Sequence, residues 1–142
     1  MTTPKVTADE ANKLFRELFP QIADFDQAIV VEDLSAKHAR VRMGYSDMHL
    51  RPGGTMSGPA MFTLADVSMY AVVFGALGLT AMAVTANMNI NFLRKPAPAD
   101  LISDCKLLKL GKRLAVSEVT IYSDGDDMPV AHATGSYAIP QS

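Results

Sequence analysis

The sequence predicts an α+β domain in which an antiparallel sheet wraps around one long central helix. Between Pro52 and Leu93 the only charged side chain is Asp66. The run Ala60–Leu77 within this stretch is apolar on nearly every side, which is typical of a helix enclosed by protein or lipid. Strand patterns precede and follow the run, and a sheet made of them needs a long apolar element to cover its inner face.

Length and composition are those of one domain over residues 1–142. The chain is 49% hydrophobic and 20% charged, which suffices for a single core. Its formal net charge of −2 gives no electrostatic reason to expect nucleic acid as a partner. A single cysteine, Cys105, excludes an internal disulfide framework, and together with a polar N-terminus it predicts a cytoplasmic protein.

The first predicted elements are a short helix and a hairpin. Thr7–Phe19 has capping-box spacing at its start, one apolar face and a proline after its end, so we expect an amphipathic helix packed over the core. Ala28–Leu34 and Lys37–Tyr45 alternate apolar with polar residues and predict two paired strands. A loop over Pro52–Thr55 follows, because its two glycines permit backbone conformations closed to other residues.

The central helix has signals at both ends. Ser57 is a good N-cap, and the proline that follows shortly after is tolerated in a first turn. Gly75 and Gly78 predict the end of the helix. Four strands follow, separated by connectors and turns: Val84–Phe92, Leu101–Leu110, Leu114–Ser123 and Val130–Ile139.

Strict alternation in Val84–Phe92 divides its side chains between two faces. Thr85 and Asn87 fall on the polar face, and Met88 and Phe92 fall on the apolar one. We expect the polar face to lie on the outer side of the sheet, where a second dimer could contact it.

A membrane span is the alternative for Ala60–Leu79, whose length matches a bilayer. Against it stand a carboxylate near the middle, the lack of an aromatic belt and the lack of Lys or Arg between Pro52 and Leu93. A lone carboxylate in apolar surroundings is costly to ionise, so Asp66 marks a candidate functional site.

The order of elements, the Gly-rich opening and the acid within the helix resemble the hotdog fold of acyl-CoA thioesterases. The closest resemblance is to the phenylacetate-pathway type, with the signature Asn-x-x-Gly-x-x-His-Gly-Gly, six residues and then Asp. Arg51–Pro59 and Asp66 correspond to it here, and Val84–Ile90 with Pro96-Ala97 match the family's third strand and its exit. The resemblance implies an acyl-CoA substrate and no cofactor.

The resemblance also implies roles for three residues. Asp66 is similar to the catalytic carboxylate, which acts as a base on water or as a nucleophile on the thioester. Gly58 is similar to the backbone N–H donor to the thioester oxygen. Thr85 is similar to the hydroxyl that orients the attacking water beside Asp66.

Three positions depart from the family's pattern. Arg51 stands for Asn or Gln, Ser57 for His, and Pro59 for the second Gly. Because proline has no N–H, an oxyanion site must depend on Gly58, with Ala60 or Arg51 as further candidates.

Helix geometry predicts that two chains share each site. Gly58 and Asp66 lie eight residues apart, about 12 Å along a helix axis. A thioester carbonyl and its attacking water lie only ~3 Å apart, so one helix cannot serve both. Two antiparallel helices would place Gly58 of one chain opposite Asp66 of the other, which predicts a two-fold homodimer. Dimer and dimer of dimers (a homotetramer) stay open.

Further residues are candidates for substrate binding. Aromatic residues on the helical face of Asp66 could line an acyl pocket, although core or dimer contacts are the alternative. Basic residues in two loops could bind CoA phosphates, with solvated charges as the alternative. The candidates are Arg51, Ser57, Phe62, Tyr70, Asn87, Arg94, Lys112 and Arg113. The three histidines show no metal-ligand spacing, so no metal is expected.

Two other functions remain open. A hotdog hydratase or dehydratase acting on acyl thioesters usually needs a histidine beside the acid, and Pro52–Leu93 contains none. A non-catalytic acyl-CoA binding dimer is compatible with the three departures from the family's pattern.

Overall fold

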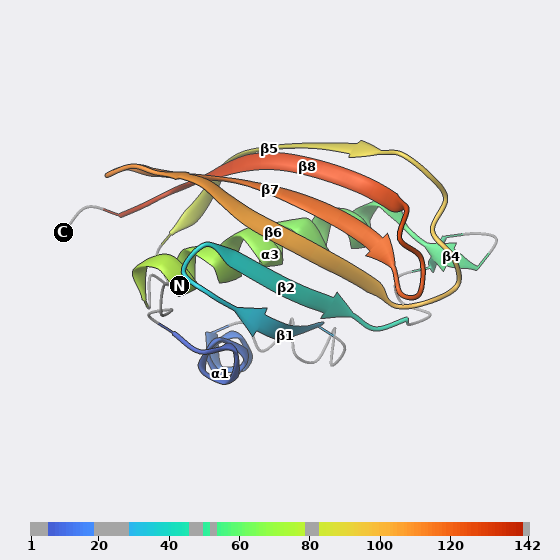
Figure 1. Ribbon diagram of the computed structural model, residues 1–142, viewed down its shortest axis with the longest axis horizontal. Helices are drawn as coiled ribbons and strands as arrows, with labels where there is room; N and C mark the ends of the chain where they lie inside the picture. Colours follow the sequence, from blue (N-terminus) through green and yellow to red (C-terminus); the bar gives the residue numbers. More distant parts are fainter. Residues whose placement is uncertain (1–5, 19–28, 46–49, 52–53, 79–82, 141–142) are drawn as a thin grey trace.

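One antiparallel sheet wraps a long helix, as the sequence predicts (Figure 1). The computed structural model describes residues 6–18, 29–45, 50–51, 54–78 and 83–140. Its elements are α1 Ala8–Leu18, β1 Ile29–Leu34, β2 His38–Met43, β3 Leu50–Arg51, β4 Thr55–Met56, α3 Gly58–Leu77, β5 Val84–Phe92, β6 Leu101–Leu110, β7 Leu114–Ser123 and β8 Pro129–Ala138. The six-stranded sheet has the order β1-β2-β6-β7-β8-β5, and its neighbouring strands are antiparallel.

Helix α3 is the core element. Leu64, Val72 and Phe74 are fully buried, and the helix contacts every strand of the large sheet. By length and composition α3 could cross a membrane, but 67% of its apolar window is buried inside this fold. The sheet thus encloses the helix, and its apolar surface is explained by the protein core.

The ends of α3 follow the sequence signals in part. Ser57 is the N-cap, with an extended backbone, and its side chain accepts a hydrogen bond from the Ala60 N–H at 3.2 Å. Gly78 ends the helix with φ 89°, and its N–H donates to the Phe74 carbonyl at 2.8 Å. The prediction for Gly75 is wrong, because this residue lies inside the last turn.

Gly75 allows a close approach between α3 and the β1–β2 turn. A Cβ at this position would collide with the Ser35 carbonyl oxygen and press on the Leu34 side chain. Because backbone cannot retreat as a flexible side chain does, only glycine fits here.

Two short strands flank the predicted loop. Leu50 pairs with Met56, and Arg51 pairs with Thr55, so the structure replaces part of the expected loop over Pro52–Thr55 with a small ladder. Gly54, with φ 81°, forms part of the turn between the two strands.

The two edges of the large sheet differ. At β1, the Asn12 side chain of α1 pairs with the backbone of Val31, donating to its carbonyl at 2.9 Å and accepting from its N–H at 2.8 Å. Thr7 and Glu10 form the predicted capping box of α1, and this helix packs along β1. At β5, the opposite edge, the described part of the chain supplies no such cover.

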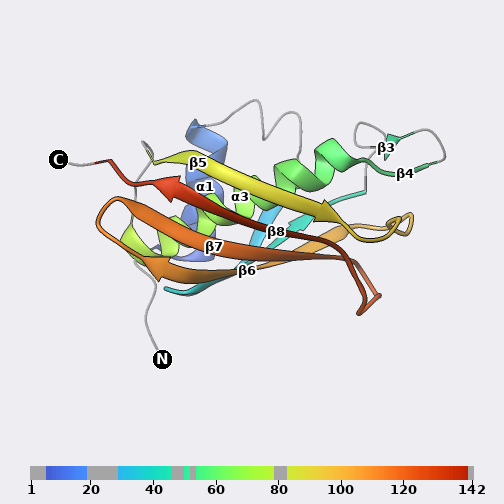
Figure 2. The same ribbon diagram turned by 90° about the horizontal axis from the view of Figure 1, so that it is seen from above.

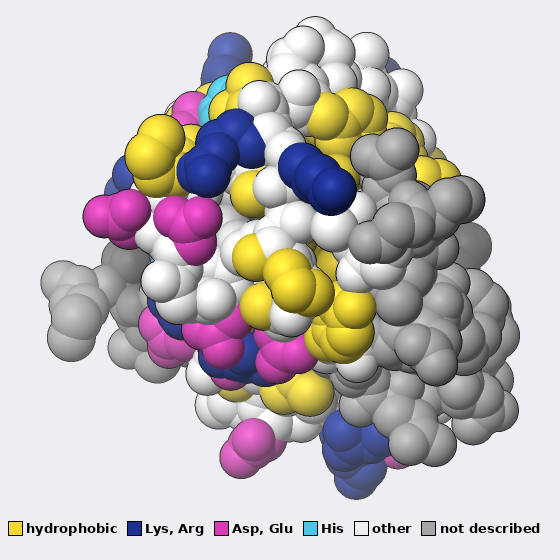
Figure 3. All heavy atoms as spheres, turned by 90° about the vertical axis from the view of Figure 1, so that its right-hand side faces the viewer, with side chains coloured by type: hydrophobic (Ala, Val, Ile, Leu, Met, Phe, Trp, Pro, Cys, Tyr) yellow, Lys and Arg dark blue, Asp and Glu magenta, His cyan; other side chains and the backbone are white. Residues whose placement is uncertain are grey.

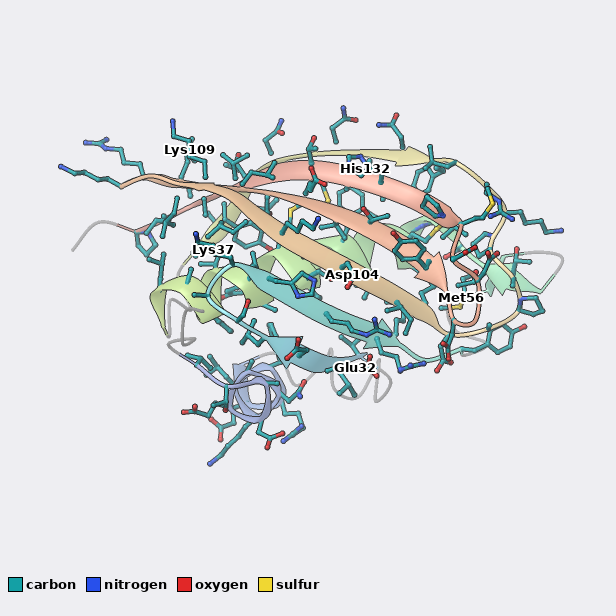
Figure 4. The ribbon with its side chains drawn as sticks, in the orientation of Figure 1. Glu32, Lys37, Met56, Asp104, Lys109 and His132 are labelled. Carbon is teal, nitrogen blue, oxygen red and sulfur yellow. The ribbon has the colours of Figure 1, made fainter. Side chains whose placement is uncertain are left out.

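The outer face of the sheet is polar, as the sequence predicts. Arg42 on β2 contacts Glu32, Asp100 and Asp124 at 2.7–3.0 Å, which raises the pKa of its guanidinium, chiefly through the Glu32 hydrogen bond. Figure 4 shows Asp104 and the nearby strands on this face, with Lys109 on the hairpin that projects at one end.

We predict that Gly75→Ala destabilises the fold by about 1–3 kcal/mol through overpacking. The direction of the change is informative, because replacing glycine by alanine inside a helix should otherwise raise the free energy of unfolding by up to ~1 kcal/mol. Urea denaturation measures the change. Gly111→Ala is the matched control, since its Cβ would meet the Leu114 carbonyl at an ordinary 3.4 Å. A neutral or stabilising Gly75→Ala would contradict the close approach.

Cys105 should be chemically silent in the native protein. Burial raises the pKa of its thiol from 9.0 to about 12, and the thiolate is the reactive species. Because the folded pKa is raised, the unfolded chain ionises first, and stability is lost as the pH rises from 9.0 towards about 12. We expect the free energy of unfolding to fall more steeply over this range in the wild type than in Cys105→Val. Equal slopes would contradict a buried, neutral thiol.

Candidate active site

Asp66 lies on the one strip of α3 that its own sheet leaves uncovered. Pro59 and Phe62 on this strip are exposed, whereas Asp66 and Tyr70 are partly buried. Their spacing of three and four residues places them on one helical face. The carboxylate therefore lies at the border between the core and the molecular surface.

Two hydroxyl groups hold the Asp66 carboxylate. Thr85 Oγ1 on β5 and the Tyr137 hydroxyl on β8 each donate to Asp66 Oδ1 at 2.6 Å. The Tyr137 hydroxyl also lies 2.9 Å from the Asp66 main-chain oxygen. Among the described residues, Asp66 Oδ2 has no hydrogen-bond donor. Hydrogen bonds to a charged acceptor are stronger than neutral ones, so the side chain is well oriented.

A β-bulge turns Thr85 towards the acid. Thr85 pairs with Tyr137, but the next pair is Asn87 with Ser136, so Ala86 is the extra residue of the bulge. Residues opposite each other in an antiparallel ladder share a face, and Tyr137 faces the core. The strict alternation expected from the sequence is therefore wrong at this end of the strand, and Thr85 joins the face that packs on α3. Bulges often re-aim a side chain at an active site.

Tyr137 is the site residue that the sequence analysis missed. Its side chain is only 3% exposed. Burial is the main cause that raises the pKa of its phenol, followed by the charge of Asp66 and the hydrogen bond to it. The phenol therefore keeps its proton and remains a donor. Tyr137 is an inward position of a strand, and a buried tyrosine usually needs a partner for its hydroxyl. A tyrosine at an inward position of a predicted strand was therefore the sequence signal that could have identified this residue.

The N-terminus of α3 leaves one N–H available. The Ala60 N–H bonds to the Ser57 side chain at 3.2 Å, and the Met61 N–H bonds to the Ser57 carbonyl at 3.1 Å. Pro59 has none. Among the described residues, the Gly58 N–H has no acceptor, which makes it the donor that a ligand at this helix end could use.

Gly58 and Asp66 mark two different regions of one chain. Gly58 faces the Phe92 ring, from which an added Cβ would lie 3.5 Å away. Asp66 touches Thr85 at the opposite end of β5. In Figure 2 the ribbon of β5 crosses that of α3.

The predicted aromatic residues lie near Asp66 on α3. Phe62 is 43% exposed. The Tyr70 ring packs against Tyr137 at 5.5 Å and against Phe74 at 4.7 Å between centroids. Burial raises the pKa of the Tyr70 phenol. Phe62 and Tyr70 can thus contact a ligand at Asp66, although Tyr70 also packs in the core.

The other predicted residues are more distant from the carboxylate. Asn87 pairs with Ser136 and faces the outer side of the sheet. Arg94 contacts Asp126 at 3.6 Å, beyond the end of β5 near Gly58. Lys112 and Arg113 lie in the β6–β7 turn, at the other end of the sheet. Ser57 uses its hydroxyl as the helix cap. Arg51 is also a predicted site residue, but its side chain lies outside the described part of the structure.

Comparisons with known proteins identify the class. The thioesterase superfamily profile matches residues 53–130. The structure of a "putative thioesterase" from Silicibacter sp. TM1040 is 40% identical, covers 99% of this chain and 96% of that one, and superposes with a TM-score of 0.87. A "putative esterase" from Saccharolobus solfataricus is 28% identical over 96% of this chain and 87% of its own.

The fold and the acid within its helix thus define a hotdog protein of the thioester hydrolases. The chain belongs to the thioesterase superfamily. The phenylacetate-pathway type is a finer assignment. A phenylacetic acid degradation protein from Thermus thermophilus is 23% identical, covers 85% of this chain and 99% of that one, and has a TM-score of 0.71, so it supports the fold alone.

Proposed function

We propose that the chain is an acyl-CoA thioesterase that acts as a two-fold dimer in the cytoplasm. In each site, Asp66 of one subunit and the Gly58 N–H of its partner act on the same thioester. The observation that carries the proposal is the oriented Asp66 carboxylate, which lies about 12 Å from the N–H of its own helix terminus.

Two neighbours within one chain suggest the position of the proposed dimer axis. Asp66 accepts a hydrogen bond from Thr85, and a Cβ added at Gly58 would lie 3.5 Å from the Phe92 ring, so α3 and β5 pass each other in opposite directions. An axis that brings Gly58 of one chain to Asp66 of the other passes midway between them, at Phe62. The same axis crosses β5 midway between Thr85 and Phe92.

The uncovered edge of β5 supports this axis. The strand carries no charged residue and no proline, and most of it is exposed. Its ends bear exposed apolar side chains, with Val84 59% and Phe92 52% exposed. An uncharged, exposed edge strand favours pairing with another strand. Antiparallel pairing of β5 with its copy would cover this edge and the exposed ring of Phe62 together.

The mechanism uses both parts of the composite site. The Gly58 N–H and the positive helix end polarise the thioester carbonyl and stabilise the oxyanion. One such donor is worth ~3 kcal/mol in the transition state. Asp66 takes a proton from water, whose oxygen attacks the carbonyl carbon, and later returns that proton to the leaving thiolate. Alternatively Asp66 attacks that carbon itself, and water then hydrolyses the acyl–Asp66 anhydride, which releases the acid and regenerates the carboxylate. In both routes the C–S bond breaks, and the CoA thiolate leaves and is protonated. Thr85 donates to Asp66 and can accept a hydrogen bond from the water.

The proposed dimer also gathers the basic residues. In one chain, Arg94 and Lys95 follow one end of β5, whereas Lys112 and Arg113 lie at the other, because Leu114 and Val84 both pair with Ala138. The axis brings the two groups of opposite subunits together, near each Asp66. Figure 3 shows the face of the molecule at which β5 ends. Basic, acidic and hydrophobic side chains are mixed on this face. These cations would bind the CoA phosphates.

We predict that Asp66→Asn lowers kcat for acyl-CoA hydrolysis by at least ~10²-fold, since it removes the acid–base group. Thiol release from a panel of acyl-CoAs measures the rate. Asp104→Asn, on the outer face beside His38, is the control and should keep the wild-type rate. Equal, slow thiol release by wild type and Asp66→Asn with intact ligand binding would favour the binding dimer. Interconversion of enoyl and 3-hydroxyacyl thioesters without thiol release would favour the hydratase.

A hybrid dimer tests the shared site. Gly58→Pro removes the N–H, and the extended backbone of Ser57 is compatible with a following proline. The Gly58→Pro and Asp66→Asn homodimers should both be nearly inactive. Their heterodimer, purified through two different tags, should regain about half the wild-type rate, because one of its two sites is complete.

A control variant and a contradicting outcome complete that experiment. Gly58→Ala keeps the N–H and should lose far less activity than Gly58→Pro. A heterodimer as inactive as its parents would contradict a site built from two subunits.

A further inference from the structure

We infer that Tyr137 is a positioning residue that, with Thr85, makes Oδ2 of Asp66 the reacting oxygen. The inference rests on the proposed function and adds to it a residue and an atom. Its basis is that both donors to the carboxylate reach the same oxygen, Oδ1, at 2.6 Å.

An unrestrained aspartate has two equivalent oxygens. Rotation about its last side-chain bond is broad and roughly two-fold, so either oxygen can take either place. Two short O–H donors to one oxygen oppose partial rotation of the group, because a part-turn would carry the charged acceptor away from both donors, whereas a half-turn only exchanges the two oxygens and restores the same arrangement. Oδ2, which has no donor among the described residues, is then the oxygen presented to water or to the thioester.

Tyr137 can hold this position because its own place is fixed. The ring is buried, packs 5.5 Å from the Tyr70 ring, and stands opposite Thr85 in the β5–β8 ladder. Its hydroxyl lies 2.9 Å from the Asp66 main-chain oxygen as well as 2.6 Å from Oδ1. The single phenol proton thus lies between the side-chain and main-chain oxygens of the residue that it orients, with Oδ1 the nearer acceptor.

Thr85 alone is a weaker restraint. It is exposed and lies beside a bulge at the uncovered edge of the sheet. Tyr137 lies one strand further in, between β7 and β5. Loss of the Tyr137 hydroxyl should leave substrate binding intact and misplace the reacting oxygen, and a small misplacement of a reacting group can cost ~10²-fold in rate.

The test is steady-state thiol release by Tyr137→Phe. We expect kcat to fall by about ten- to a hundred-fold with KM within about two-fold of the wild type. Tyr122→Phe makes the same chemical change on the outer face of β7 and should keep the wild-type rate. A thermal melt of each variant checks the fold. Wild-type kcat in Tyr137→Phe, or a raised KM with unchanged kcat, would overturn the inference.

A double variant separates positioning from other roles. If Tyr137 acts through Asp66, adding Tyr137→Phe to Asp66→Asn should leave the residual rate unchanged. A further fall equal to that seen in the wild-type background would show an independent role and overturn the inference. Full activity of Asp66→Asn would overturn the proposed function and the positioning role with it. An inactive Asp66→Asn beside a fully active Tyr137→Phe would overturn the positioning role alone.

Discussion

The hydrogen bonds from the sheet to Asp66 are the constraint on which the site depends. An ionised carboxylate on an otherwise apolar helix is expensive to keep unless donors reach it. Thr85 and Tyr137 supply two donors from neighbouring strands, and both bind one oxygen. The fold thereby keeps the charged side chain at the margin of the core. The same contacts leave the other oxygen for chemistry.

The unequal edges of the sheet are consistent with the proposed second chain. The amide of Asn12 pairs with the backbone of Val31 on β1, and α1 packs along that edge. The opposite edge, β5, carries neither a charge nor a proline to discourage pairing. Asp66 and Gly58 lie beside this second edge, one at each end of it. The proposed pairing of β5 with its copy would therefore bury the edge and complete two sites in one step.

The sequence predicted the helices and long strands because their signals are local. Ser57 and Gly78 mark the ends of α3 through backbone chemistry that depends on a few neighbouring residues. The role of Gly75 could not be predicted in this way. Glycine is required there because a Cβ would collide with the Ser35 carbonyl, which belongs to another element. The resemblance put Thr85 beside Asp66, where the structure has it. Strand alternation put it on the outer face, because a bulge depends on the pairing register, which alternation along one strand does not reveal. Tyr137 required the same knowledge of register.

The departures from the family's pattern change how the proposed site would work. With Pro59 lacking an N–H, and with the Ala60 and Met61 N–H groups already bonded to Ser57, the first turn of α3 offers only the Gly58 N–H among the described residues. A single backbone donor stabilises an oxyanion less than two would. More of the rate must then come from the placement of the acid relative to the carbonyl. A carboxylate fixed by two strands, rather than by one flexible side chain, is the arrangement that such a site requires.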